Sequence, residues 1–201
     1  MEDFHSEDIL PVPKYRFEEL AFESDELRFA VMNSKATSEV TDYYMRNRAF
    51  HAEFSQTHDD KYFTYSTQKK YLIDEVKDFN RNRILPLFIT YKGNPKHIIG
   101  RISFFHFAFG GMRNCIIGYS LDKEEEGKGI MTKAVPYAMN FLSQFYSIHR
   151  VDAYILPKNE RSLKLIKRVG FIEEGIKHEF MHINGKWEDH IDFYYLFEKN
   201  N

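Results

Sequence analysis

The amino-acid sequence predicts a mixed α/β (α+β) fold in which a largely antiparallel sheet is flanked by helices. Three observations lead to this prediction. Strand-like segments outnumber helical segments along the chain. In the middle of the chain, three strand-like segments follow one another with only short turns between them, which is typical of antiparallel neighbours. Two apolar helical stripes, beginning at Ile130 and Arg161, then separate the later strands.

The expected strands are separated by clear turn signals. Glycine-containing turns at residues 93–95 and 110–111 interrupt the central strands. The pair Asn184-Gly185 predicts a type I′ turn in a terminal hairpin. The expected strands cover residues 27–32, 85–91, 97–109, 114–121, 151–156, 171–183 and 187–197.

Helical spacing of apolar side chains predicts four helices. The first follows Ser38, the second is capped by Ser66, the third begins at Ile130, and the fourth covers residues 161–169. The third helix contains Pro136, which has no backbone N–H and therefore kinks a helix or leaves one carbonyl unpaired.

The length of 201 residues is sufficient for one sizeable domain. The first residues are polar and contain two prolines, so we expect an N-terminal arm over residues 1–24 and a single domain over residues 25–201. A net charge of −2 gives no overall attraction to nucleic acid or to an anionic membrane, and we expect neither as a partner. The sequence does not indicate an oligomeric state.

Cysteine usage and hydropathy predict the compartment. The single cysteine, Cys115, excludes an internal disulfide and favours a reducing compartment. The acidic N-terminus lacks the apolar run of a signal peptide, and no apolar stretch approaches the ~20 residues of a spanning helix. We therefore expect a cytoplasmic protein in which Cys115 is a packed structural thiol in a strand.

The loop 124–129, with the sequence EEEGKG, joins an expected strand to an expected helix. Its glycines allow successive backbone N–H groups to converge, and the positive end of the following helix adds to the attraction for an anion. A glycine pair between strand and helix is as often only a tight turn, and the loop matches neither the ATPase loop nor the dinucleotide fingerprint. Because three glutamates would repel an anion, we expect their side chains to point outward, with Lys128 balancing the field.

Two further segments indicate what the loop binds. Residues 118–121 (GYSL) precede it, while residues 159–162 (NERS) open the last expected helix and residues 170–171 (GF) follow that helix. In this order and spacing, the segments resemble the GNAT superfamily of N-acetyltransferases, and most closely its RimJ/RimL branch. The likeness extends from about residue 27 to residue 198, and residues 44–54 resemble the substrate-side helix of that branch.

The resemblance implies a splayed pair of strands that opens a slot for acetyl-CoA, the expected cosubstrate. Backbone groups of Tyr119 and Leu121 would pair with the pantetheine, Asn159 would bond to it, and Ser162 would lie near the thiol. By residue type alone, Asn159 and Ser162 are more typical of ordinary helix caps. Glu124 stands where the superfamily usually has Gln or Arg. The pyrophosphate would be held by the backbone amides of Glu126, Gly127, Lys128, Gly129 and Ile130.

Direct acetyl transfer needs a neutral amine, a proton acceptor and stabilisation of the oxyanion and the thiolate, without a covalent enzyme intermediate. Glu179, on the penultimate expected strand, is the candidate base, and Ser162 is the second candidate catalytic residue. For Glu179 the alternative is an ordinary exposed strand glutamate. Tyr194 and Tyr195 are weaker candidates for an acid.

A competing motif, H-E-x-x-H, occurs at residues 178–182. In a zinc protease this motif lies on a helix, where its two histidines share one face about 6 Å apart. In the expected strand, His178 and His182 would be roughly 13 Å apart, and one zinc ion could not reach both. We therefore expect no metal and reject the protease.

The acceptor is expected to be a primary amine, either a protein N-terminus of the ribosomal-protein type or a small amine such as a polyamine or an antibiotic. An α-amino group has a pKa of ~7.7–8.0 and is neutral far more often at pH 7 than a lysine side chain with a pKa of ~10.4. This difference favours an α-amine. A domain that binds acetyl-CoA without catalysis is the remaining alternative.

Overall fold

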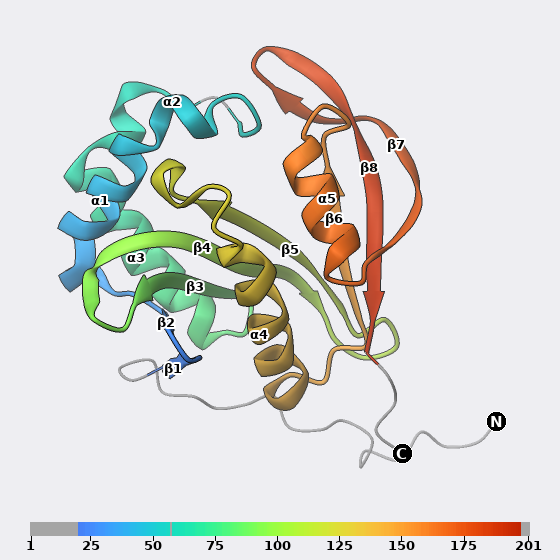
Figure 1. Ribbon diagram of the computed structural model, residues 1–201, viewed down its shortest axis with the longest axis horizontal. Coiled ribbons are helices and arrows are strands. Elements are labelled where there is room, and N and C mark those ends of the chain that lie inside the picture. Colours follow the sequence, from blue (N-terminus) through green and yellow to red (C-terminus); the bar gives the residue numbers. More distant parts are fainter. Residues whose placement is uncertain (1–19, 57, 198–201) are drawn as a thin grey trace.

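The computed structural model describes residues 20–56 and 58–197 (Figure 1). They form an eight-stranded sheet with the strand order β1-β2-β3-β4-β5-β6-β8-β7. All neighbouring strands are antiparallel except β5 and β6, which are parallel. This sheet confirms the predicted fold class. The strands are β1 (Ala21–Glu23), β2 (Leu27–Ala30), β3 (Ile84–Tyr91), β4 (Asn94–Ala108), β5 (Asn114–Leu121), β6 (Arg150–Ile155), β7 (Ile172–Ile183) and β8 (Lys186–Leu196).

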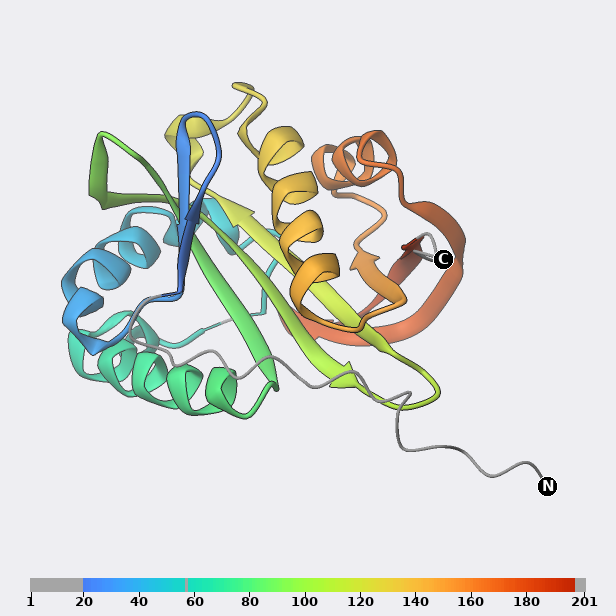
Figure 2. The same cartoon turned by 90° about the horizontal axis from the view of Figure 1, so that it is seen from below.

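Helices lie on both sides of the sheet (Figure 2). Helices α1 (Thr37–Arg46) and α3 (Tyr65–Asn80) pack on one face, and the one-turn helix α2 (Arg48–His51) follows α1. Helices α4 (Ile130–Phe145) and α5 (Glu160–Arg168) lie on the other face. Three short 3-10 segments complete the described elements: η3 (Ser34–Ala36), η4 (Asp60–Phe63) and η5 (Lys123–Glu125).

Strand alternation divides the core into two clusters. On β3, Leu87 and Ile89 face the α4 side, where the fully buried Ala134 and Leu142 of α4 meet the sheet. Phe88, between them, faces the opposite side. The smaller cluster beneath α1 and α3 contains Val40, Tyr43, Leu72, Phe88 and Ile98.

The observed elements differ from the predicted ones at several places. Helix α3 begins at Tyr65 and is capped by Thr64, whose hydroxyl accepts the Thr67 N–H, so the predicted Ser66 cap is wrong. Strand β4 begins at Asn94, because a two-residue turn joins it to β3. Strand β1 was not predicted, and it pairs with β2 at the end of the expected N-terminal arm. Residues 1–19 of that arm lie outside the described residues.

Pro136 lies inside the uninterrupted helix α4. The Pro136 side chain is exposed. Because proline has no N–H, the carbonyl of Thr132, one turn earlier, loses its helical hydrogen-bond partner. Near the surface, water can pair with this carbonyl, which explains how α4 accommodates the proline. Of the helices formed by residues 20–56 and 58–197, none is long and apolar enough to cross a bilayer.

Candidate active site

Strands β5 and β6 separate after a short parallel ladder. The ladder begins with Asn114 opposite Arg150 and ends with Ile116 opposite Asp152. Both strands continue beyond this point without pairing with each other. The structure therefore contains the predicted splayed pair, and the last part of β5 offers backbone groups along an open edge.

The backbone direction at the end of β5 follows from one hydrogen bond. The Asp122 N–H donates to the Ile99 carbonyl of β4 at 2.8 Å. Since the N–H and C=O of one peptide point in opposite directions, the Leu121 carbonyl points away from β4 and into the gap. Alternate residues of a strand share this direction, so Tyr119 also faces the gap. This orientation is the one that the expected pairing with pantetheine requires.

The Leu121 carbonyl already has a partner. His51, the last residue of α2, places its Nε2 atom 2.8 Å from the Leu121 oxygen. Leu121 therefore retains its N–H for a ligand, together with both backbone groups of Tyr119. Burial lowers the pKa of His51, while the contact with Leu121 and the charge of Asp122 partly offset that effect.

The loop after β5 leads to the start of α4, and one of the amides expected to bind a ligand is already paired, since the Glu126 N–H donates to the Lys123 carbonyl at 3.3 Å. The Asp122 side chain accepts the Glu124 N–H at 3.1 Å and begins η5. Gly127 and Gly129 then have φ angles of 75° and 74°, which side-chain-bearing residues rarely adopt. Gly129 is the N-cap of α4 and has no side chain to cap the first turn. A Cβ at either glycine would meet nothing within 4 Å, so the space over the loop is open.

The acidic side chains of the loop are mostly neutralised. Glu125 is only 8% exposed, and its Oε2 accepts from the Tyr91 hydroxyl at 2.7 Å and from Lys128 Nζ at 3.1 Å. The expectation that all three glutamates point outward is therefore wrong for Glu125, which these two donors hold inside. Glu126 forms an ion pair with Arg161 of α5. Lys128 and Arg161 thus offset the negative charges of Glu125 and Glu126 beside the loop amides.

The residues at the start of α5 face the splayed strand. Asn159 is the N-cap of α5, and its Oδ1 accepts the Ser162 N–H at 3.1 Å. The Tyr119 hydroxyl donates to the Ser162 carbonyl at 3.4 Å, which joins β5 to α5 across the gap. Burial raises the pKa of Tyr119 to about 12. The capping alternative for Asn159 is therefore present in the structure, and its amide group remains for a ligand.

Glu179 lies apart from these residues. It is exposed on the edge strand β7, and β8 separates β7 from β6. A bulge between Lys177 and Met181 gives Glu179 a φ of 47°, and its backbone N–H donates to Asp189. Within the described parts of the chain, no hydrogen bond or ion pair joins its side chain to the splayed strands. Its role as a base remains a prediction.

The other candidates from the sequence lie near the closed end of the gap. Tyr194 is opposite Asp152 on β6, with the Arg150 guanidinium 4.6 Å above its ring. Tyr195 packs against Phe171. Cys115 is fully buried within β5, and burial raises the pKa of its thiol, which confirms a packed structural cysteine.

Helices α1 and α2 hold the end of β5 in place, and this contact was not predicted in detail. Four consecutive residues, 120–123, each bind a side chain from this region. The sequence offered only the likeness of residues 44–54 to a substrate-side helix as a signal. The four contacts are Tyr43 to Ser120 (2.9 Å), His51 to Leu121 (2.8 Å), Arg46 to Asp122 (2.6 Å) and Asn47 to the Lys123 N–H (2.9 Å).

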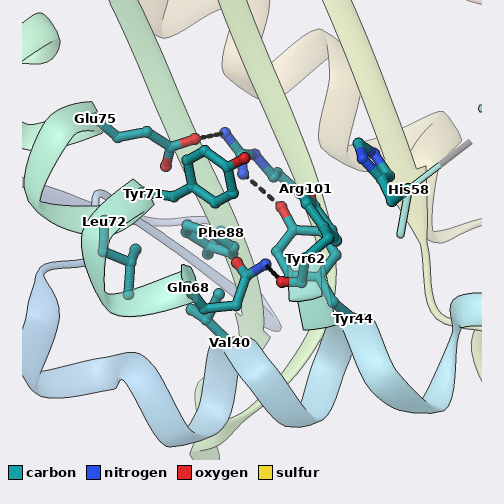
Figure 3. Close-up of a pocket in the computed structure, with 10 residues that line it drawn as sticks. All are labelled: Val40, Tyr44, His58, Tyr62, Gln68, Tyr71, Leu72, Glu75, Phe88 and Arg101. Atoms are coloured by element: carbon teal, nitrogen blue, oxygen red, sulfur yellow. Dashed lines mark hydrogen bonds and ion pairs between the residues drawn. The ribbon is translucent and has the colours of Figure 1, made fainter. Parts of the chain in front are cut away.

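A cavity of about 340 Å³ lies between the sheet and the layer of α1 and α3 (Figure 3). At its floor, Arg101 binds Glu75 and the Tyr44 hydroxyl, and its Nε donates to Ser103 at 2.9 Å. None of the residues expected to hold acetyl-CoA lines this cavity. Its lining residues are Val40, Tyr44, His58, Tyr62, Gln68, Tyr71, Leu72, Glu75, Phe88 and Arg101.

The H-E-x-x-H residues belong to strand β7, which confirms the strand that led us to reject a zinc protease. His178 binds Asp189 at 2.9 Å, and the ring of His182 contacts Trp187. The described residues contain no group of three or more His, Cys, Asp or Glu side chains that could hold a metal ion.

Comparisons with known proteins agree with this geometry. Residues 21–172 match the family described as an acetyltransferase (GNAT) domain. The [ribosomal protein uS5]-alanine N-acetyltransferase of Escherichia coli (strain K12) is 28% identical over 180 residues, which cover 90% of each chain. The crystal structure of ribosomal-protein-S5-alanine acetyltransferase from Vibrio fischeri superposes with a TM-score of 0.83 at 30% identity, covering 89% of this chain and 97% of that chain.

A third similarity concerns the fold. Mycobacterium smegmatis RimJ, solved in complex with CoA-disulfide, has a TM-score of 0.80 at 19% identity, covering 85% of this chain and 81% of that chain. The splayed strands, the glycine loop and the family match together define a class of enzyme. The chain belongs to the GNAT family and is an N-acetyltransferase.

Proposed function

We propose that this enzyme transfers the acetyl group of acetyl-CoA to the α-amino group of a protein N-terminus, of the ribosomal-protein type. The observation that carries the proposal is the open edge of β5, which the loop of residues 122–129 connects to the uncapped first turn of α4. An open strand edge suits an extended amide chain such as pantetheine, and an uncapped helix N-terminus suits a pyrophosphate. The relatives that act on ribosomal proteins support the acceptor class.

Each part of acetyl-CoA then has a protein counterpart. The backbone groups of Tyr119 and the N–H of Leu121 pair with the pantetheine amides. The Asn159 amide group bonds to the same arm, and Ser162 lies near the thiol, where it stabilises the leaving thiolate. The pyrophosphate is held by the backbone amides of Gly127, Lys128, Gly129 and Ile130, and the Glu126 amide joins them only if it gives up its 3.3 Å bond to the Lys123 carbonyl.

The chemistry needs no enzyme nucleophile. A neutral amine attacks the acetyl carbonyl carbon, a C–N bond forms, the C–S bond breaks, and CoA leaves as the thiol after protonation. The α-amine is favoured because its pKa of ~7.7–8.0 leaves roughly a tenth of it neutral at pH 7, against less than one part in a thousand for lysine. A small amine, such as a polyamine, is the second candidate acceptor.

A comparison of acceptors tests this function. Peptides with free or blocked N-termini, each with and without lysine, are offered beside spermidine, and CoA thiol release is measured. We expect turnover only with free N-termini, whether or not lysine is present. Turnover that survives N-terminal blocking and disappears without lysine would overturn the α-amine proposal, as would a clear preference for spermidine. Acetyl-CoA binding without turnover on any amine would indicate a binding domain.

A further inference from the structure

His51 contacts the end of β5, and no sequence pattern identified it as a candidate site residue. His51 lies on α2, 70 residues before Leu121, the residue of β5 that it contacts. Its Nε2 atom is 2.8 Å from the Leu121 carbonyl, which points into the gap between β5 and β6. The imidazole is therefore at the open edge where the proposed function places the pantetheine arm.

The contact with Leu121 fixes the tautomer of the ring. A backbone carbonyl can only accept a hydrogen bond, so Nε2 must carry the proton. In the neutral ring the other nitrogen, Nδ1, then has a free lone pair and can accept a proton. The partly buried environment favours this neutral form, since it lowers the pKa of His51 from its usual range.

The surroundings hold the ring in place. The ring lies 5.8 Å from that of Tyr43 and 5.6 Å from that of Phe50. The charge of Asp122 raises the pKa of His51 and so partly offsets the effect of burial, and Asp122 itself pairs with Arg46 at 2.6 Å. Tyr43 is neutral, because burial raises its pKa. His51 is thus a neutral base, and the segment that carries it is bound to four consecutive residues of the chain, 120–123.

Other titratable groups at the site are poorer bases at neutral pH. Tyr119 has a pKa raised to about 12, and the thiol of Cys115 is fully buried. Glu179 is exposed on the edge strand, with β8 between it and the splayed pair. Of the described side chains that contact the open end of β5, His51 is the one that combines a basic nitrogen with a neutral form favoured by burial.

We propose that His51 is the general base of the transfer, which rests on the proposed function. Nδ1 takes one proton from the protonated acceptor amine, and the neutral amine attacks the acetyl carbon of acetyl-CoA. As the C–N bond forms and the C–S bond breaks, the remaining surplus proton on nitrogen passes to the departing thiolate. The imidazolium then returns its proton to water, so that the products are the acetylated amine, CoA and one proton.

The test compares His51→Gln with the wild type over a range of pH. The glutamine amide can still donate to the Leu121 carbonyl, but it has no basic nitrogen. We expect kcat/KM at pH 7.5 to fall by about 100-fold or more. The ratio of wild-type to variant kcat/KM should shrink toward one as the pH falls below the usual histidine range, because His51 is then protonated in the wild type. Added imidazole should partly restore the activity of His51→Ala.

The controls separate this role from cofactor binding and from the proposed function itself. His58→Gln, which changes an exposed histidine of the neighbouring loop, should leave kcat/KM unchanged. The thermal stabilisation of His51→Gln by acetyl-CoA should equal that of the wild type. A variant with full activity and an unchanged pH dependence would overturn the role of His51, as would the loss of acetyl-CoA stabilisation. Absence of wild-type turnover with every amine would instead refute the proposed function, and the role of His51 with it.

Discussion

The start of α4 and the cavity around Arg101 differ in whether their polar groups already have hydrogen-bond partners. At α4, Gly129 offers no cap to the first turn, and the space above Gly127 is open. In the cavity, the Arg101 guanidinium already binds Ser103, Tyr44 and Glu75 and stacks 4.9 Å from the Phe88 ring. Donors without partners indicate a site that is completed by a ligand, whereas donors with partners indicate a network that stabilises the fold. The cavity around Arg101 is therefore not the better candidate for the active site.

The largest effect on stability is expected at the cavity. The side chains of Arg101 and Glu75 are 17% and 21% exposed, so removing one of them leaves a largely buried charge without its partner. Arg101→Met should lower the free energy of unfolding by about 3 kcal/mol, measured by urea denaturation. The double variant with Glu75→Leu should recover part of the loss. The stabilisation by acetyl-CoA should persist, and its loss would show that the cavity takes part in binding.

In the glycine loop, by contrast, a substitution should remove the stabilisation by acetyl-CoA. Acetyl-CoA at 100 times its Kd should stabilise the wild type by about 2.7 kcal/mol, while ATP and NAD should not. Gly127→Val should abolish this stabilisation, because a branched side chain fills the space above the amides and strains a backbone with φ of 75°. Thermal melting with and without acetyl-CoA measures the effect.

The matched control is Gly110→Val, in the turn between β4 and β5. Gly110 has a φ of 77° and also has nothing within 4 Å of an added Cβ, so it reproduces the strain away from the loop. This variant should keep the full acetyl-CoA stabilisation. If both variants lose it, strain rather than a blocked ligand site is the cause.

Local signals explain what could be predicted from the sequence. The end of β5 and the start of α4 are encoded by strand alternation followed by Gly127 and Gly129, all within a dozen residues. The positions of His51 and Glu125 depend on partners that lie 70 and 34 residues away, Leu121 and Tyr91. No local pattern contains such pairings. For the same reason, outward-facing glutamates were expected in a loop where one of them is buried.

A smaller effect is expected at Asn159, which combines two roles. Asn159→Ala should destabilise the protein by about 1 kcal/mol, because the Ser162 N–H loses its cap. Asn159→Ser should keep most of that stability, since serine also caps helices, while it removes the amide group. We expect both variants to bind acetyl-CoA about two- to tenfold more weakly by calorimetry. An unchanged affinity of Asn159→Ser for acetyl-CoA would show that Asn159 acts only as a helix cap.

The smallest effect is expected at the ion pair between Glu126 and Arg161. Their side chains are 35% and 50% exposed, so Glu126→Gln should change the free energy of unfolding by less than about 1 kcal/mol. Removing a negative charge beside the expected pyrophosphate should tighten acetyl-CoA binding slightly, and the gain should shrink in high salt. A weaker affinity at all salt concentrations would show that the Glu126 carboxylate itself contributes to binding.

Hydrogen–deuterium exchange with and without acetyl-CoA tests the contrast between the two regions most directly. Amides without partners exchange quickly until a ligand shields them. We expect acetyl-CoA to slow exchange in residues 117–132, which include the open edge of β5, the loop and the first turn of α4. Residues 71–76 and 98–103, which surround Glu75 and Arg101, should exchange at the same rate in both conditions. Slower exchange confined to those two segments, with none in the loop, would contradict the account.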